Sequence, residues 1–148
     1  MDPRKGKHCK FKFVGNRKKL GDVSAVRKFL ELVVPAVGMQ ALAEPIMFDI
    51  PIVLEKANLS CAEDEGGVTG VASGAVRSVI SGTAVLSTSH AAIHTWPEHS
   101  YAVFDLYSCR DFSLLVVTAL LTEHFDIGIG DMQVHDFSYS LDFHKPLL

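Results

Sequence analysis

The sequence predicts an α+β fold: a two-layer sandwich in which a mainly antiparallel sheet carries two helices packed on one face. Segments that alternate between apolar and polar residues outnumber helical segments, and only two stretches show helical spacing of apolar residues. The predicted order along the chain is β-α-β-β-β-β-α-β, which suits an antiparallel sheet with both helices on one face.

Length and composition favour a single soluble domain over residues 1–148. With 148 residues, 48% hydrophobic and 21% charged, the chain can bury a core of ordinary size. No apolar run reaches the roughly 18 residues that a membrane span needs. The charged N-terminus lacks the apolar segment of a secretory signal, and three cysteines without close pairing favour free thiols in a reducing, cytoplasmic compartment.

The charge distribution is uneven, although the net charge is only −3. Residues 1–19 hold eight of the fourteen Lys and Arg residues against one acid, Asp2. We interpret this segment as a solvated arm followed by a polar strand face. The alternative, a patch for anions or polynucleotides, lacks an aromatic-rich binding motif, so no nucleic-acid partner is predicted.

The N-terminal half begins with residues 8–14, whose period of two predicts a half-buried strand. A turn is predicted over residues 15–21. Asp22 is placed to cap a helix that carries apolar residues at helical spacing and that Pro35 and Gly38 should end.

Two further segments complete this half of the chain. The apolar residues 46–54 contain Pro51, which predicts an edge strand or two short pieces. Residues 57–74 are Gly-rich and acidic, with Glu63, Asp64 and Glu65 in a row, and predict a surface loop.

The C-terminal half is predicted to hold more strands and the second helix. Residues 75–86 have a strand pattern that Ser81-Gly82 interrupts, and residues 101–107 place Ala102, Phe104 and Leu106 on one face of a strand. Asp111 is a candidate cap for an apolar helix over residues 112–124. A turn at 127–130 and a last strand over 132–143 follow.

The segment 87–98 carries the densest set of reactive side chains. It holds the hydroxyls of Ser87, Thr88 and Ser89, two histidines at 90 and 94, the only Trp, and Glu98. Strand-like runs flank it on both sides. A reactive segment in that position predicts a site on a sheet.

The residue types permit several chemistries, which composition alone leaves open. Ser89 can be an acyl-transfer nucleophile with His94 or His90 as its base. It can also attack its own preceding carbonyl, which yields an ester, a cut backbone and a pyruvoyl group. His90 and His94, with His99 or Glu98, match no strong metal motif, so no metal site is predicted.

Cys109 also has two interpretations. It is either a core thiol at the end of a strand or a proton donor, if a cation or a histidine lies nearby.

Residues 88–98 resemble the processing and active-site segment of the prokaryotic-type S-adenosylmethionine decarboxylases. That family reads Glu-Ser-His, three residues, His-Thr-Trp-Pro-Glu, and then a Tyr-rich strand that ends in a cysteine. Here Cys109 lies twenty residues after Ser89, and Ser81-Gly82 begins eight residues before it, where the family has its Ser-Gly. Gly6-Lys7-His8 is similar to the start of the family's first strand.

The resemblance implies a pyruvoyl-dependent decarboxylase that acts on S-adenosylmethionine in polyamine (spermidine) synthesis. Self-cleavage between Thr88 and Ser89 would give chains 1–88 and 89–148 and convert Ser89 into the pyruvoyl cofactor. The pyruvoyl carbonyl forms a Schiff base with the substrate amine and acts as an electron sink.

The resemblance also implies roles for individual residues. His94 and Ser81 would assist processing, and Cys109 would protonate the substrate α-carbon. Glu98 would bind the ribose hydroxyls, and Trp96 would pack beside the site, although a core position for Trp96 is an equal alternative. A homodimer or higher homo-oligomer is implied, with sheets packed so that both protomers shape the site.

Several positions depart from the family pattern. Thr88 stands where the family has Glu, and Ala75 stands where an aromatic residue stacks on adenine. Val79-Ile80 replaces a Gly-Val, while residues 67–70 look like that motif but lie too far from Ser89. These departures motivate two alternatives: decarboxylation of another amine, such as a basic amino acid, or an uncleaved, non-catalytic homologue that serves as a binding or regulatory subunit.

Overall fold

A computed structural model describes residues 5–53 and 76–140 of the chain. The predictions made for the loop 57–74 and for Ala75 fall outside the described residues. So do the look-alike motif at 67–70 and Cys61.

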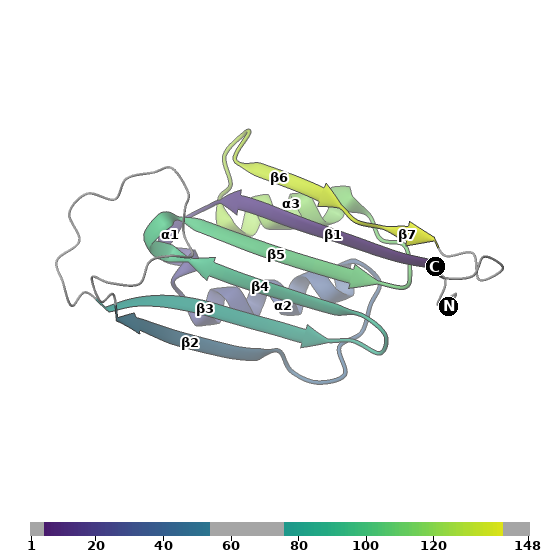
Figure 1. Cartoon of the computed structure of the whole chain (residues 1–148), viewed down its shortest axis with the longest axis horizontal. Coiled ribbons are helices and arrows are strands. Elements are labelled where there is room, and N and C mark those ends of the chain that lie inside the picture. Colours follow the sequence, from purple (N-terminus) through teal and green to yellow (C-terminus); the bar gives the residue numbers. More distant parts are fainter. Residues whose placement is uncertain (1–4, 54–75, 141–148) are drawn as a thin grey trace, which may run out of the picture.

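Within the described residues, seven strands form one sheet, and all paired strands run antiparallel (Figure 1). The spatial order is β2-β3-β4-β5-β1-β6, and β7 pairs with the start of β1. The strands are β1 (Lys5–Val14), β2 (Ile46–Val53), β3 (Val76–Val85), β4 (His90–Trp96), β5 (Tyr101–Ser108), β6 (Met132–Asp136) and β7 (Tyr139–Ser140).

The two long helices lie on the same face of the sheet, behind it in Figure 1. They are α2 (Val23–Ala36) and α3 (Leu114–Phe125), and the short α1 (Arg17–Leu20) lies beside the 3-10 turn η1 (Pro97–His99) at one end of the strands. The predicted α+β class is therefore confirmed. None of the described helices is long and apolar enough to cross a membrane.

Helix α2 begins and ends as its sequence predicts. The carboxylate of Asp22 accepts hydrogen bonds from the backbone N–H groups of Ser24 and Ala25. These N–H groups lie in the first turn and have no carbonyl partner within the helix. Pro35 lies in the last turn, and Gly38 adopts a left-handed φ of +74° just beyond it.

The predicted cap of α3 is wrong. Ser113 caps this helix by accepting from the N–H of Val116 at 3.3 Å. Asp111 instead accepts a hydrogen bond from Lys7 Nζ at 2.6 Å, so its carboxylate ties the start of β1 to this loop.

Two predictions about strand continuity are also wrong. Strand β3 continues through Gly82, where the missing side chain makes room for Met47: a Cβ there would lie 2.7 Å from the Met47 thioether. The single last strand predicted over 132–143 is divided, because the N–H of Ser138 turns to the Asp136 carboxylate at 2.8 Å. The predicted turn 15–21 contains the four-residue helix α1.

The core lies between the sheet and the two long helices. Phe29 of α2 is at its centre, with its ring 5.0 Å from that of Phe104 on β5 and 5.2 Å from that of Phe125 on α3. All three side chains are fully buried. We call this side of the sheet the covered face.

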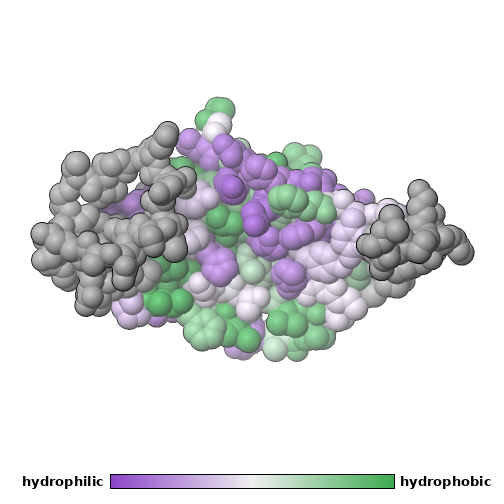
Figure 2. Space-filling view, viewed as in Figure 1, coloured by the Kyte–Doolittle hydropathy of each residue, from purple (hydrophilic) through white to green (hydrophobic). Residues whose placement is uncertain are grey.

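The opposite side, the open face, has no described helix over it (Figure 1). Figure 2 shows hydrophilic side chains over its middle and hydrophobic ones along its lower edge, where β2 lies. Ile46, Phe48 and Ile50 of β2 are 51%, 57% and 44% exposed, and their register partners include Ser81. Polar candidates and an apolar edge therefore share one face.

Candidate active site

The turn between β3 and β4 places Ser89. The N–H of Leu86 donates to the carbonyl of Ser89 at 3.0 Å, and Val85 pairs with His90 immediately outside the turn. Leu86 is buried and bridges to Ala41, which anchors the turn to the body of the protein. Ser89 is half-buried, and its peptide link to Thr88 lies in this tight connection.

Cys109 lies against this turn from the end of β5. Its Sγ is 2.8 Å from Oγ1 of Thr88, the residue before Ser89. The thiol is half-buried and free of any disulfide. The structure thus brings together three of the predicted site residues, Thr88, Ser89 and Cys109, and we call them the turn cluster.

Ser81 and His94 form a second pair farther along the sheet. They stand directly opposite each other on β3 and β4, and Ser81 Oγ lies 2.8 Å from Nδ1 of His94. Both side chains are on the open face. A serine hydroxyl bonded to an imidazole is an arrangement that can hold and move a proton.

Trp96 also lies on the open face, two residues beyond His94. Its ring centroid is 6.4 Å from that of His94 and 5.6 Å from that of Tyr101. The tryptophan is half-exposed and lies beside His94, so it is not a core residue.

The predicted residues do not all meet within one chain. His94 is five residues from Ser89 along an extended strand, or about 16 Å at roughly 3.3 Å per residue. Glu98 lies farther still, in η1, where its carboxylate accepts a hydrogen bond from Arg17. Within one protomer, the turn cluster therefore lies apart from the Ser81–His94 pair and from Glu98.

A joint metal site for His90 and His94 is excluded by the same spacing. Both imidazoles are on the open face, but the Cα atoms that carry them are about 13 Å apart along β4 at roughly 3.3 Å per residue, whereas zinc ligands bind at about 2 Å. Among residues 5–53 and 76–140, no group of three or more His, Cys, Asp or Glu side chains is arranged to hold a metal ion.

Sequence reasoning missed a polar network next to the turn cluster. Nε2 of His8 on β1 lies 2.9 and 3.0 Å from the two carboxylate oxygens of Asp105 on β5, and Nε2 of His90 lies 3.4 Å from one of them. Alternation puts Asp105 on the face of Tyr107, but only the strand register brings these residues together.

Burial and neighbouring groups shift the pKa of one residue on each face of the sheet. The hydrogen bond between the hydroxyls of Tyr107 and Tyr139, and secondly burial, raise the pKa of Tyr107, so this phenol stays neutral at physiological pH. On the covered face, burial and the negative charge of Asp136 raise the pKa of Cys9, which keeps it an inert thiol.

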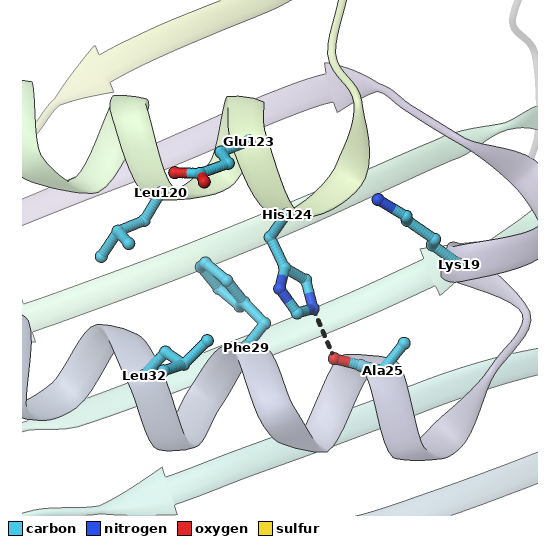
Figure 3. Close-up of a pocket in the computed structure, with 7 residues that line it drawn as sticks. All are labelled: Lys19, Ala25, Phe29, Leu32, Leu120, Glu123 and His124. Atoms are coloured by element: carbon cyan, nitrogen blue, oxygen red, sulfur yellow. Dashed lines mark hydrogen bonds between the residues drawn. The ribbon is translucent and has the colours of Figure 1, made fainter.

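A cavity of about 460 Å³ lies between α2 and α3, on the other side of the sheet (Figure 3). Phe29 and Leu120 form its apolar wall, and His124 donates from Nε2 to the carbonyl of Ala25 at 2.7 Å. None of the turn-cluster residues lines it, so the cavity is separate from the candidate site.

Comparison with known proteins gives short local matches and a match of the whole fold. S-adenosylmethionine decarboxylase proenzymes from Thermosipho melanesiensis and Pseudomonas aeruginosa are each 56% identical over 32 residues, 22% of this chain and 25% and 20% of theirs. The match thus spans about a quarter or less of these relatives' length. The crystal structure of the adenosylmethionine decarboxylase from Aquifex aeolicus matches with a TM-score of 0.66 at 16% identity, over 97% of this chain and 98% of that chain, which demonstrates a shared fold.

A family model described as S-adenosylmethionine decarboxylase matches residues 7–137. This range includes strands β2 to β6, all but the first two residues of β1, both long helices and every residue of the candidate site. The chain therefore belongs to the S-adenosylmethionine decarboxylase family.

Proposed function

We propose that this protein is a pyruvoyl-dependent S-adenosylmethionine decarboxylase of polyamine synthesis, made by self-cleavage between Thr88 and Ser89. The observation that carries the proposal is the turn cluster: a serine in a tight connection, with a thiol 2.8 Å from the side chain of the preceding residue. Membership of the family supports the same reaction.

The proposed cleavage needs only groups that the chain supplies, and one water. Ser89 Oγ attacks the carbonyl carbon of Thr88, an ester forms, and the C–N bond between the two residues breaks. Removal of the Ser89 α-proton then breaks the bond between Ser89 Cβ and the ester oxygen. Thr88 is left with a free carboxylate. The resulting enamine tautomerises and takes up water, which releases ammonia and leaves a pyruvoyl group at residue 89.

The residues around Ser89 fit such a group. The pyruvoyl carbonyl supplies an electron sink for decarboxylation of a bound amine substrate. We assign to Cys109 the task of holding a proton on Sγ and delivering it to the substrate α-carbon. Its half-buried position beside residue 88 supports that role, because the thiol is both near the cleavage point and reachable from the open face.

We further propose that the working enzyme is a homodimer, with the open faces of two protomers together. Within one chain, His94 is about 16 Å along the strand from Ser89, too far to exchange a proton with it. A partner whose sheet faces the first can bring its Ser81–His94 pair and its Glu98 to the turn cluster. The exposed apolar edge of β2 supplies surface for this contact.

The assignment of Glu98 to the substrate ribose rests on its exposed carboxylate, which Arg17 orients. Trp96 is proposed to pack beside the same substrate, because its ring lies on the open face. A cytoplasmic location is proposed as well, since the described cysteines, Cys9 and Cys109, are free thiols.

One observation favours a second candidate function, an uncleaved binding or regulatory subunit. Thr88 has no carboxylate, and its hydroxyl is bonded to the thiol that the decarboxylase needs. In that case the turn cluster would be a stable structural contact in a protein that regulates another enzyme.

The intact mass of the purified protein under denaturing conditions separates the two. The decarboxylase predicts fragments of 88 and 60 residues that together gain one water and lose one ammonia, while Ser89→Ala stays full-length. A single mass of the whole chain, unchanged over time, would reject the pyruvoyl enzyme and leave the subunit. Size-exclusion chromatography with light scattering tests the dimer.

A further inference from the structure

A chain of polar contacts crosses three strands of the open face beside the turn cluster. Its centre is Asp105 on β5, which is 21% exposed. Asp105 accepts from His8 with both oxygens, at 2.9 and 3.0 Å, and one oxygen lies 3.4 Å from Nε2 of His90. One carboxylate thus joins an imidazole from each neighbouring strand.

The strand register explains why these residues meet. His8 on β1 and His90 on β4 both stand directly across from Tyr107, one on each side of β5. Asp105 is two residues back on the same face, so it is the diagonal neighbour of both imidazoles. The arrangement is therefore a property of the sheet, and it does not depend on a loop.

Tyr107 holds the other side of His90. The two rings stack with centroids 5.6 Å apart and an angle of 29° between their planes. The Tyr107 hydroxyl is itself bonded to that of Tyr139 at 2.9 Å. Tyr139 reaches this position over Gly6, where a Cβ would lie only 2.6 Å from its ring.

The side chain of His90 consequently contacts a carboxylate oxygen at 3.4 Å and stacks on an aromatic ring. His90 directly follows Ser89 in the sequence and is the first residue of β4. Fixing its side chain fixes the backbone that carries the Ser89 carbonyl. The Leu86–Ser89 hydrogen bond and the Val85–His90 pairing of the β3–β4 connection then hold the backbone of Ser89 next to His90.

We propose that Asp105 is a positioning residue for self-cleavage: through His90, it holds the peptide between Thr88 and Ser89 in the geometry for attack. The proposal rests on the proposed function. Asp105 touches neither Ser89 nor the scissile bond in the contacts described, so its effect passes through the imidazole of His90. The bond from His8 keeps the carboxylate in place.

The first test measures the rate of self-cleavage. Asp105→Asn keeps the shape of the side chain but removes the negative charge and one of the two oxygens that face the imidazoles of His8 and His90, and we expect cleavage to slow by roughly 10- to 100-fold. Asp49→Asn is the matched control, because it makes the same change on an exposed position of β2, and should cleave at the wild-type rate. Equal rates for Asp105→Asn and wild type would overturn the proposal.

A double variant separates positioning from general stability. If Asp105 acts through His90, adding Asp105→Asn to His90→Gln should slow cleavage no further than His90→Gln alone. Fully multiplicative effects of the two substitutions would contradict the proposed route. A melting temperature for each variant identifies any that fails to fold.

A third measurement does not need cleavage. In a Ser89→Ala background the chain stays intact, and amide hydrogen exchange of residues 86–92 reports how firmly the turn is held. We expect Asp105→Asn to speed this exchange by about tenfold or more relative to the same background alone. Unchanged exchange overturns the positioning role. An uncleaved wild type would reject the proposed function, and exchange alone would then decide whether Asp105 holds the turn.

Discussion

The covered and open faces of the same sheet have opposite characters, although each strand contributes to both. On the covered face, β5 places Ala102, Phe104 and Leu106 in the core, all fully buried. On the open face, the alternate residues of the same strand include Asp105, which hydrogen-bonds to His8 of β1, and Tyr107, which hydrogen-bonds to Tyr139 of β7. A period of two thus assigns stability to one face and chemistry to the other.

If this division holds, the largest change in the free energy of unfolding should come from the covered face. Phe104→Ala removes a buried ring that contacts Phe11 and Phe29, at centroid distances of 5.7 and 5.0 Å. We expect it to destabilise the fold by about 3–5 kcal/mol in urea or thermal unfolding. Leu115→Ala on α3, where the side chain is 78% exposed, should cost about 0.5 kcal/mol or less.

The next largest effect is expected on the rate of self-cleavage, from a change on the open face that leaves the free energy of unfolding unchanged. His94→Ala breaks the bond to Ser81 on the open face, and we expect self-cleavage to slow by about 100-fold or more, as for loss of an acid–base group. Gel densitometry over time measures the rate, and His99→Ala in η1 serves as a histidine control. A His94 variant that cleaved normally but had a lowered melting temperature would show that this histidine stabilises the fold and takes no part in processing.

The difference between local and long-range contacts also explains which features of the fold could be predicted from the sequence and which could not. Alternation along β5 and the Asp22 cap of α2 are local signals, and the structure agrees with both. The cap of α3 is also local, yet Asp111 and Ser113 compete for it, and a lysine from β1 draws the aspartate away. Long-range pairing decided that choice.

The site divides in the same way. Ser89 and Cys109 stand out by residue type and spacing, whereas the contact of Asp105 with His8 and His90 depends on which strands are neighbours and in which register. A one-residue shift of β1 against β5 would move His8 to the covered face. No property of the residue types in a single strand contains that information.

Thr95 is an exception to the division between the two faces, because it is a polar residue on the covered face of β4. Its hydroxyl is fully buried and donates to the carbonyl of Leu20 at 2.8 Å, so it ties the sheet to α1. Thr95→Val keeps the shape but leaves that carbonyl without its partner, and should destabilise the fold by about 1–3 kcal/mol in equilibrium unfolding. Thr95→Ser keeps the hydroxyl and should lose less. Equal losses in both variants would mean that packing, and not the hydrogen bond, explains the role of Thr95.

The smallest effect is expected near the start of β1, where Lys7 reaches the exposed carboxylate of Asp111 at 2.6 Å. The hydrogen bond and charge of Lys7 lower the pKa of Asp111, so the folded state favours the ionised form. The stability from this pair is therefore present above the ordinary pKa of an aspartate and is lost as the pH falls through the lowered value. Asp111→Asn should reduce the melting temperature slightly at neutral pH, less in high salt, and not at all in acid below that value. A difference that persisted unchanged into acid would show that the amide disturbs the backbone near Phe112, because the charge of Asp111 would already be gone.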